Sequence, residues 1–275
     1  MSTWRSDSEI SLFNRSQQND WQSISADTMT VIEYARRTSE QTLGAFDASV
    51  APLVNLWGFG PTQAQSITEF SKPSPNAIAK TAYRVGYQSI NVDTNSRAIR
   101  KDSTTNELDL SGIAKGFAVD KVALILDAYG INNYLVELGG ELRSRGRNSQ
   151  GKAWRVAIER PSTKQRSVYR IINLENSAVA TSGDYRNFFL DGGVRYSHTI
   201  DPRTGSPSNH ELASVSVIAE TTMQADSLST AFMVMGPGDA LSYANTHGIA
   251  AHLILRSASG KLAEIHSDAF ASFLS

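Results

Sequence analysis

The stretch Glu107-Leu-Asp-Leu-Ser-Gly-Ile-Ala-Lys-Gly-Phe-Ala-Val-Asp120 is the part of the chain around which the rest is organised. It predicts a short strand that carries Asp109, a turn at Ser111 and Gly112, and a helix whose first turn holds Lys115. Such a junction gathers backbone N–H groups, the positive end of a helix dipole and a carboxylate around one point, which suits a phosphate and a metal. An ordinary strand-to-helix junction, in which Ser111 caps the helix, is the alternative interpretation.

The composition is that of an ordinary globular protein. The 275 residues are 40% hydrophobic and 19% charged, which provides for a sizeable core. Lys+Arg number 26 and Asp+Glu 27, and no run of five like charges occurs, so we expect no nucleic-acid partner. The chain has no cysteine, which excludes disulfides and a thiol nucleophile and fits a reducing or an oxidising compartment. No apolar run is long enough to span a bilayer, and we expect no membrane contact by this chain itself.

The order of the predicted elements indicates an α+β fold. Strand-like stretches follow one another through the middle of the chain, at 134–138, 154–158, 168–174 and 178–181. Because turns and not helices separate them, we expect a mostly antiparallel sheet with helices packed on one face. No repeat or clear linker is present, so the sequence predicts a single domain over residues 1–275.

Helical periodicity and capping residues predict helices at 6–14, 26–43, 75–85, 221–235 and 239–246. The helix at 221–235 begins with a capping box, in which Thr221 is followed three residues later by Gln224. Residues 45–61 differ from these segments, because they are rich in aromatic and small residues without a helical or a strand period. We expect this stretch to be irregular and to pack in a loop-built site or under the core.

Two oxygen-bearing side chains lie four residues apart in the predicted helix at 221–235. Asp226 and Thr230 therefore share one helix face, where both can give oxygen to a hard cation such as Mg²⁺. The alternative is that Asp226 favours the helix dipole and Thr230 bonds back to its own helix.

One histidine stands out from the others by its setting. His198 precedes the Asp-Pro turn at Asp201, a plausible pose for a general base or a phosphate ligand, although a single histidine is more often packed or on the surface. The remaining histidines show no metal-ligand spacing. Two further segments keep two interpretations each: Thr181–Arg186 suits an anionic ligand or a plain turn, and Gly139-Gly140 suits the close approach of a ligand or core packing.

Taken in order, these segments resemble the FAD:protein FMN transferase family, the ApbE-type flavin transferases. The matching runs are Ser2–Ser11, Gly44–Asp47, Pro52–Gly60, Asp109–Gly116, Val136–Gly140, Thr181–Arg186, Ser197–Pro202, and Ala225-Asp226 with Thr230. They occur in family order across almost the whole chain. The resemblance implies a Mg²⁺-dependent enzyme that breaks the pyrophosphate of FAD, transfers FMN to a threonine or serine hydroxyl of a target flavoprotein, and releases AMP.

The resemblance also implies residue roles, carried over by position. The FAD site would be lined by Trp4, Ala45, Phe46 and Asp47, with Asp109 and Lys115 from the central stretch. The Mg²⁺ ligands would be Asp226, Thr230 and the main-chain carbonyl of Gly112, and His198 would assist catalysis.

The beginning of the sequence departs from the family pattern. Members of the family normally start with a lipoprotein or secretion signal, followed by a strand with a Met-Gly-Thr type motif that touches the flavin, and here nothing precedes Met1. We expect this chain to lack that signal and first strand. We also expect the full-length protein to be periplasmic and anchored to the inner membrane through an N-terminal lipid.

Two other functions use the same residues. Water could replace the protein hydroxyl as the acceptor, which would make the chain an FAD pyrophosphatase that gives FMN and AMP. A flavin-binding or scaffold protein without turnover is the alternative from another class.

Overall fold

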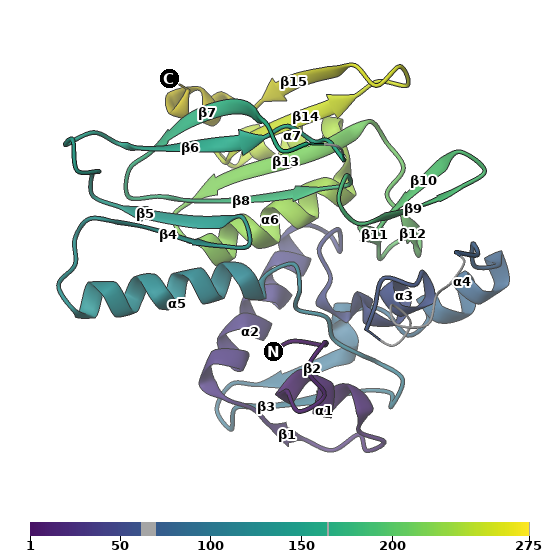
Figure 1. Ribbon diagram of the computed structural model, residues 1–275. Coiled ribbons are helices and arrows are strands. Elements are labelled where there is room, and N and C mark those ends of the chain that lie inside the picture. The colour runs from purple at the N-terminus through teal and green to yellow at the C-terminus, as the bar shows by residue number, and fades with distance from the viewer. Residues whose placement is uncertain (62–69, 164, 275) are drawn as a thin grey trace. The chain divides into compact units, whose positions relative to one another are not determined.

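The computed structural model (Figure 1) describes residues 1–61, 70–163 and 165–274. Its contacts divide the chain into two compact units. Unit 1 comprises Met1–Ala114 and Phe188–Ser208, and unit 2 comprises Lys115–Asn187 and Asn209–Ser275. The expected single domain stays a prediction, because this division does not test whether the units fold independently. In the described part of the chain no helix is long and apolar enough to cross a membrane.

Unit 2 is built on a six-stranded sheet with the strand order β15-β14-β13-β8-β5-β4. Its strands are β4 (Tyr134–Leu138), β5 (Glu141–Arg145), β8 (Ala178–Gly183), β13 (Leu212–Ala219), β14 (Ala250–Arg256) and β15 (Leu262–His266). Every neighbouring pair is antiparallel, which confirms the predicted sheet type. Short turns join β4 to β5 and β14 to β15, as expected for antiparallel neighbours.

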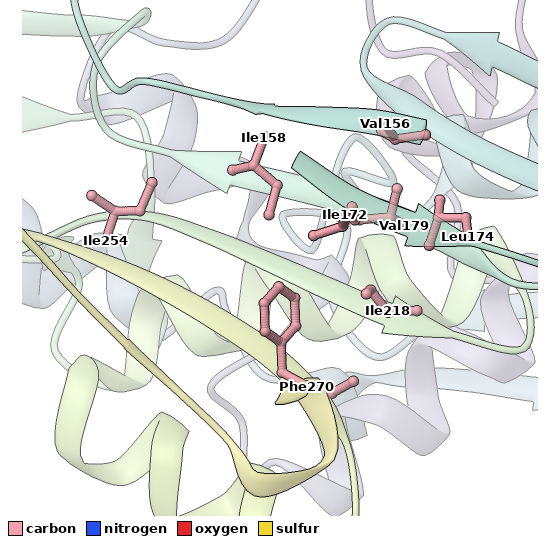
Figure 2. Packing of buried hydrophobic residues seen from close by; sticks show 9 residues of the cluster. Val156, Ile158, Ile172, Leu174, Val179, Ile218, Ile254 and Phe270 are labelled. Atoms are coloured by element: carbon pink, nitrogen blue, oxygen red, sulfur yellow. The ribbon is translucent and has the colours of Figure 1, made fainter. Parts of the chain in front are cut away.

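A hydrophobic core lies on one face of this sheet. The antiparallel pair β6 (Trp154–Glu159) and β7 (Val168–Leu174) packs over the sheet with the short helix η3 (Asp268–Phe273). Figure 2 shows side chains from these elements pointing toward one another. The buried members of the cluster are Val156, Ile158, Ile172, Leu174, Val179, Ile218, Ala250, Ile254 and Phe270. Burial of such side chains is the main stabilising contribution to this unit, at about 25 cal/mol per Å² of apolar surface removed from water.

Helix α6 (Thr222–Met235) packs against β8 and β13. The Ser182 hydroxyl of β8 hydrogen-bonds the Ser229 hydroxyl of α6, so Ser182 and its register partner Val215 face the helix. Since side chains alternate along a strand, Ile218 belongs to the opposite face, toward the β6–β7 pair. The sheet therefore has a helix on one face and a strand pair on the other.

Helix α5 (Ala114–Ala128) approaches the N-terminus of α6 closely. The Asp120 carboxylate of α5 accepts the N–H groups of Thr222 and of the residue after it, each at 2.9 Å. Gly116 allows this approach, because a Cβ at that position would lie 2.4 Å from the Thr222 carbonyl oxygen. The predicted capping box is half confirmed, since the Thr221 hydroxyl accepts the Gln224 N–H at 3.2 Å. Helix α7 (Pro237–Thr246) follows α6.

Unit 1 combines short helices with a three-stranded antiparallel sheet of order β1-β3-β2 and two small strand pairs. Its helices are α1 (Glu9–Arg15), α2 (Ala26–Gln41), η1 (Ala48–Val50), α3 (Ala51–Leu56), α4 (Pro75–Ala82) and η2 (Tyr87–Ser89). Its strands are β1 (Gln22–Ser23), β2 (Ile90–Asp93), β3 (Ala98–Lys101), β9 (Phe188–Asp191), β10 (Val194–Ser197), β11 (Ile200–Asp201) and β12 (Ser206–Pro207).

The structure corrects two local predictions in unit 1. Residues 45–61 are not irregular throughout, because η1 and α3 occupy 48–56; a helix of this length, buried on several sides, leaves no period in the sequence. Residues 107–110, all of them described, form no strand. The Asp109 N–H instead donates to the carbonyl of Ala48 in η1 at 2.7 Å.

An aromatic cluster forms the core of the part of unit 1 that contains α3. Trp57 is 2% exposed, and its indole N–H donates to the Gly205 carbonyl at 2.9 Å. Its ring stacks on Tyr196 with 5.7 Å between centroids, and Phe70 stacks on Phe189 at 4.5 Å. These contacts hold the segment after β10 against α3, although the two are more than a hundred residues apart in the sequence.

Candidate functional site

The central stretch adopts the predicted turn and helix start. Asp109 is half-buried, and its carboxylate accepts the backbone N–H of Ser111 at 2.8 Å as well as the Ser111 hydroxyl. Helix α5 then begins at Ala114, whose N–H donates to the Leu110 carbonyl at 2.8 Å, and Lys115 lies in its first turn as predicted. The Ser111 hydroxyl is therefore engaged by Asp109, and the turn is held by the carboxylate.

Asp47 lies next to this turn and is a buried, fully bonded carboxylate. It is 7% exposed and accepts the Ser49 N–H and the Ser49 hydroxyl, each at 2.7 Å, and the Tyr87 N–H at 2.9 Å. Burial raises the pKa of Asp47, and these hydrogen bonds oppose the rise. Because the next residue, Ala48, accepts the Asp109 N–H, two predicted FAD-site segments lie side by side.

The other predicted flavin contacts of unit 1 differ in exposure. Trp4 is 58% exposed in the first turn of the chain, so its ring is accessible for stacking on a flat ligand. Ala45 is 1% and Phe46 3% exposed. A ligand would therefore meet the backbone of these two residues, while the Phe46 ring supports the segment from inside.

His198 lies in the bend between β10 and β11, and the turn after it is fixed as predicted. The Asp201 carboxylate accepts the backbone N–H of Arg203 and two guanidinium N–H groups of the same residue, all at 2.9 Å. His198 is half-buried, and its ring meets Phe59 edge to face at 6.3 Å between centroids. Phe59 packs in turn on Phe189 at 4.8 Å. The imidazole is thus set against a rigid aromatic wall.

The turn after His198 also lies close to the predicted FAD segment. Gly44 has φ +78°, and a Cβ built on it would lie 3.9 Å from Cγ of Arg203. Within unit 1 the structure therefore brings together residues 44–59, 86–87, 109–111 and 198–205. These include the predicted residues Ala45, Phe46, Asp47, Asp109 and His198.

In unit 2, Asp226 is a buried carboxylate with little compensation. It is 2% exposed, and among the described residues its side chain accepts one hydrogen bond, from the Gly116 N–H at 2.9 Å. Burial raises the pKa of Asp226 to about 7; Lys115 lowers this pKa, and Glu141 raises it. A carboxyl held this way gains most from a nearby cation, which would restore its charged form.

Thr230 lies one turn after Asp226 on the same helix face, as predicted. Its hydroxyl is 3.4 Å from the Ser182 hydroxyl, a long contact that leaves the oxygen available to another partner. It is Ser229 that bonds back to its own helix, by donating to the Asp226 carbonyl at 3.0 Å. The hydrogen bond back to the helix, which was the alternative interpretation for Thr230, is therefore made by the neighbouring residue Ser229.

Glu141 is a buried carboxylate next to the predicted residue Lys115, and the sequence did not indicate it. It is 2% exposed, and the Lys115 ammonium donates to its Oε1. Its Oε2 is buried and has no hydrogen-bond partner among the described residues. The available signal was an acidic residue directly after the Gly139-Gly140 turn, a place where a side chain can be held against a helix start.

Comparison with known proteins decides the family. The model of the ApbE family matches residues 1–253. An FAD:protein FMN transferase of Haemophilus influenzae is 44% identical over 264 residues, which cover 94% of this chain and 75% of that protein. One from Vibrio cholerae is 43% identical over 275 residues, which cover 100% of this chain and 80% of that protein. The chain belongs to the ApbE family.

Solved structures of the ApbE family share the fold. The flavin transferase ApbE from Vibrio cholerae superposes with a TM-score of 0.88 at 42% identity, covering 100% of this chain and 85% of that one. The flavinyl transferase ApbE from Pseudomonas stutzeri, in its apo form, gives 0.88 at 38% identity, covering 100% and 83%. The family resemblance and the α+β fold predicted from the sequence are confirmed, and so is the prediction of an enzyme.

The donor set of unit 2 fits the Mg²⁺ implied by the family. No group of three or more His, Asp or Glu side chains that could hold a metal occurs among residues 1–61, 70–163 and 165–274. Mg²⁺ usually takes only one or two protein carboxylates and completes its shell with water and substrate phosphates. The buried Asp226 carboxyl and the Thr230 hydroxyl fit that pattern. Gly112 belongs to unit 1, and its carbonyl stays a prediction.

The polar side chains of the run Thr181–Arg186 are bonded to other residues of unit 2. The Thr181 hydroxyl hydrogen-bonds the Ser216 hydroxyl at 2.7 Å. Asp184 pairs with Arg256 through two hydrogen bonds of 2.7 and 3.0 Å, and Arg186 pairs with a glutamate of β6. The charges of this run are therefore engaged in ion pairs within unit 2, the Asp184 pair part-buried and the Arg186 pair exposed, which favours the structural interpretation over an anion site.

Proposed function

We propose that this chain transfers FMN from FAD to a threonine or serine hydroxyl of a target flavoprotein in a Mg²⁺-dependent reaction that releases AMP. The observation that carries the proposal is the state of Asp226, a carboxyl 2% exposed with its pKa raised to about 7, on a helix beside Lys115. A buried acid of this kind is characteristic of functional sites. The names of the ApbE-family relatives supply the substrate.

Lys115 acts on the pyrophosphate of FAD in this proposal. The pyrophosphate carries two negative charges that must be offset before a hydroxyl can approach phosphorus. Lys115 offers an ammonium with three donors at the first turn of α5, where the helix dipole also favours an anion. Asp226 and Thr230 would hold Mg²⁺, with the Gly112 carbonyl as a third ligand. When bound, Mg²⁺ supplies Lewis-acid stabilisation of the charge that develops on the phosphoryl oxygens.

His198 is the proposed base. One imidazole nitrogen accepts the proton of the attacking threonine or serine hydroxyl, a role that histidine fills most often in enzymes. The ring packs edge to face with Phe59 in the structure. This orientation matters because proton transfer requires the nitrogen to be within hydrogen-bond reach of the hydroxyl.

The flavin and the adenosine part of FAD would be bound by residues of unit 1. We assign Trp4 to ring stacking, the backbone at Ala45 and Phe46 to the wall of the site, and Asp47 and Asp109 to holding that wall in shape. The support is that Asp47 and Asp109 bind neighbouring backbone groups of the same two segments. Their carboxylates preorganise the site, which reduces the entropy lost on binding.

The deciding experiment combines the protein with FAD and Mg²⁺, with and without an acceptor protein that carries the target threonine. AMP is followed by chromatography and covalent flavin by in-gel fluorescence. We expect both products only with acceptor, FAD and Mg²⁺ together, and neither in EDTA. AMP without covalent flavin would indicate a pyrophosphatase, and FAD that stays intact for many hours would indicate a binding protein without turnover.

We further propose that the full-length protein works in the periplasm, anchored to the inner membrane by an N-terminal lipid. The support is the signal that members of the ApbE family normally carry. Fractionation of cells that express the full-length protein tests this location. Recovery in the cytoplasmic fraction, with the acceptor unmodified, would contradict it.

A further inference from the structure

Glu141 begins β5 directly after the Gly139-Gly140 turn and lies almost entirely out of solvent. Its side chain is 2% exposed, whereas the side chain of its ion-pair partner Lys115 is 48% exposed. The buried carboxylate is the fixed member of this pair, and the long lysine side chain is the member that must be oriented. A buried carboxylate is costly to desolvate, so its presence calls for an explanation beyond stability.

The pair leaves hydrogen-bonding capacity on both sides. A lysine ammonium has three donors, and one of them goes to Glu141 Oε1. Two N–H groups of Lys115 therefore remain for a ligand. Glu141 Oε2 is also without a partner among the described residues, which is unusual for a buried polar atom whose role is only structural.

The glycine turn makes room for this arrangement. Gly139 has φ +66°, and a Cβ built on it would lie 3.3 Å from Glu141 Oε2 and 3.8 Å from Cδ of Lys115. A side chain at this position would crowd the Glu141 carboxylate, would come into van der Waals contact with Lys115, and would strain the backbone. The Gly139-Gly140 turn thus leaves space for the Lys115–Glu141 pair. This role differs from the two interpretations given by the sequence, core packing and direct contact with a ligand.

We propose that Glu141 is a positioning residue for FAD binding: it fixes the Lys115 ammonium so that the two remaining N–H groups meet the pyrophosphate. The inference rests on the proposed function for the identity of the ligand. It goes beyond that function because it assigns the affinity for FAD partly to a carboxylate that does not itself bind the anion.

The sign of one measurement separates this role from simple electrostatics. If Glu141 contributed only its charge, its removal would strengthen the binding of a dianion, since a nearby negative charge would be lost. If Glu141 positions Lys115, its removal weakens binding, because the ammonium loses its orientation. The two accounts predict opposite changes in the dissociation constant for FAD.

The test measures FAD affinity by fluorescence titration in EDTA, where the proposed reaction does not turn over. Glu141→Gln should bind FAD roughly tenfold more weakly than the parent, the value of one oriented charge-assisted hydrogen bond. Glu175→Gln is the matched control, because Glu175 also pairs with a basic residue of unit 2, Arg147, at 2.8 Å. That control should bind FAD as the parent does.

A double variant tests whether the effect acts through Lys115. In a Lys115→Met background, Glu141→Gln should cause little further loss, because there is no ammonium left to orient. Glu141→Asp, which keeps the charge on a shorter arm, should lose affinity to an intermediate degree, and it serves if Glu141→Gln does not fold. Thermal unfolding checks each variant.

Two outcomes would overturn the inference. One is a Glu141→Gln protein that folds and binds FAD as tightly as the parent or more tightly. The other is a set of independent effects, in which the double variant loses the product of the two single losses. A parent that binds FAD but releases no AMP with acceptor and Mg²⁺ contradicts the proposed function alone, and the affinity comparison still decides the role of Glu141.

Discussion

Two buried aspartates, Asp47 in unit 1 and Asp226 in unit 2, show how one residue type serves two purposes. Asp47 is 7% exposed and Asp226 is 2% exposed. Asp47 accepts three hydrogen bonds, from two groups of Ser49 and from the Tyr87 N–H. Asp226 accepts one, from the Gly116 N–H, in the described part of the chain. Hydrogen bonds therefore offset more of the cost of burying the Asp47 carboxylate than of burying the Asp226 carboxylate.

This difference in hydrogen bonding predicts different roles for the two aspartates. A carboxylate with several hydrogen bonds fixes a loop, and those hydrogen bonds offset part of the cost of its burial. An uncompensated one costs stability until a cation arrives, and such groups concentrate at functional sites. Changes at Asp47 should therefore affect the fold, and changes at Asp226 should affect the chemistry.

The largest expected effect is at Asp226. Asp226→Ala should lower Mg²⁺-dependent AMP release by more than about 10³-fold while the protein stays folded, because a charged metal ligand is lost. Thr230→Ala should cost only about tenfold, since water can replace a neutral ligand. AMP release is measured with FAD, Mg²⁺ and acceptor, and folding by circular dichroism.

Asp239→Asn provides the control for that comparison. Asp239 is an exposed aspartate in the first turn of α7, so its change should leave the rate unaltered. An Asp226→Ala protein that cleaves FAD at the parent rate would remove the metal site from α6. It would also end the contrast between the two aspartates.

The next effect concerns His198, the reactive group assigned to unit 1. His198→Ala should keep FAD affinity within a few-fold but slow FMN transfer by roughly 10²–10⁴, the range of general acid–base catalysis. The parent rate should fall toward low pH, because a protonated imidazole cannot accept the proton of the hydroxyl. Single-turnover rates across pH 5–8 (roughly the range in which histidine titrates) check both statements. If the variant transfers FMN at the parent rate, or if the rate does not change with pH, His198 is not the general base. Asp109 or the metal would then be the candidate for that role.

Substitutions of the two aspartates should change the stability of the protein in opposite directions. Asp47→Ala leaves three donors without their acceptor and should lower the free energy of unfolding by roughly 2–4 kcal/mol. Asp226→Asn removes a poorly compensated charge and should raise the unfolding temperature of the metal-free protein at pH 8. Both are measured by denaturation in EDTA. Two losses of similar size would mean that Asp226 is a structural residue like Asp47.

The pH dependence of the same assay isolates Asp226. Its pKa rises from 3.8 in the unfolded chain to about 7 in the folded protein, so the folded state holds this proton over a wider range. The resulting stability is fully present below about pH 4 and is lost as the pH rises through 7. The curve for Asp226→Asn, subtracted from that of the parent, should show a decline of a few kcal/mol over this window. A flat difference would show that the carboxylate is compensated after all.

The smallest expected effect is at Trp4, which is 58% exposed in unit 1. FAD should quench tryptophan fluorescence, and Trp4→Ala should reduce the quenching and weaken FAD binding by about three- to tenfold, the loss of one aromatic contact. Trp21, which is 46% exposed outside the predicted contacts, gives the matched variant Trp21→Ala. Equal quenching and affinity in the parent and Trp4→Ala would remove Trp4 from the site.

Local sequence determined those helix starts whose capping residues lie within a few positions of one another. Ser25 caps α2 by accepting the Thr28 N–H, and Thr221 caps α6 in the same way, three residues apart in each case. The order of the family motifs indicated the family and the α+β fold, both now confirmed. The strand pair β9–β10 was not predicted although Gly192-Gly193 marks its turn, because the consecutive apolar residues 188–190 do not alternate with polar ones.

Only the tertiary structure decided which buried polar groups of the candidate site have hydrogen-bond or ion-pair partners. Asp47 finds Tyr87 40 residues away, Asp226 finds Gly116 110 residues away, and Lys115 finds Glu141 26 residues away. No local pattern encodes such partners, since they depend on how helices and sheets pack. The sequence by itself determined which residues could carry chemistry, through residue type and spacing. Burial and long-range hydrogen bonds determined that Asp47 would stabilise a turn and that Asp226 would be buried with one hydrogen bond from Gly116.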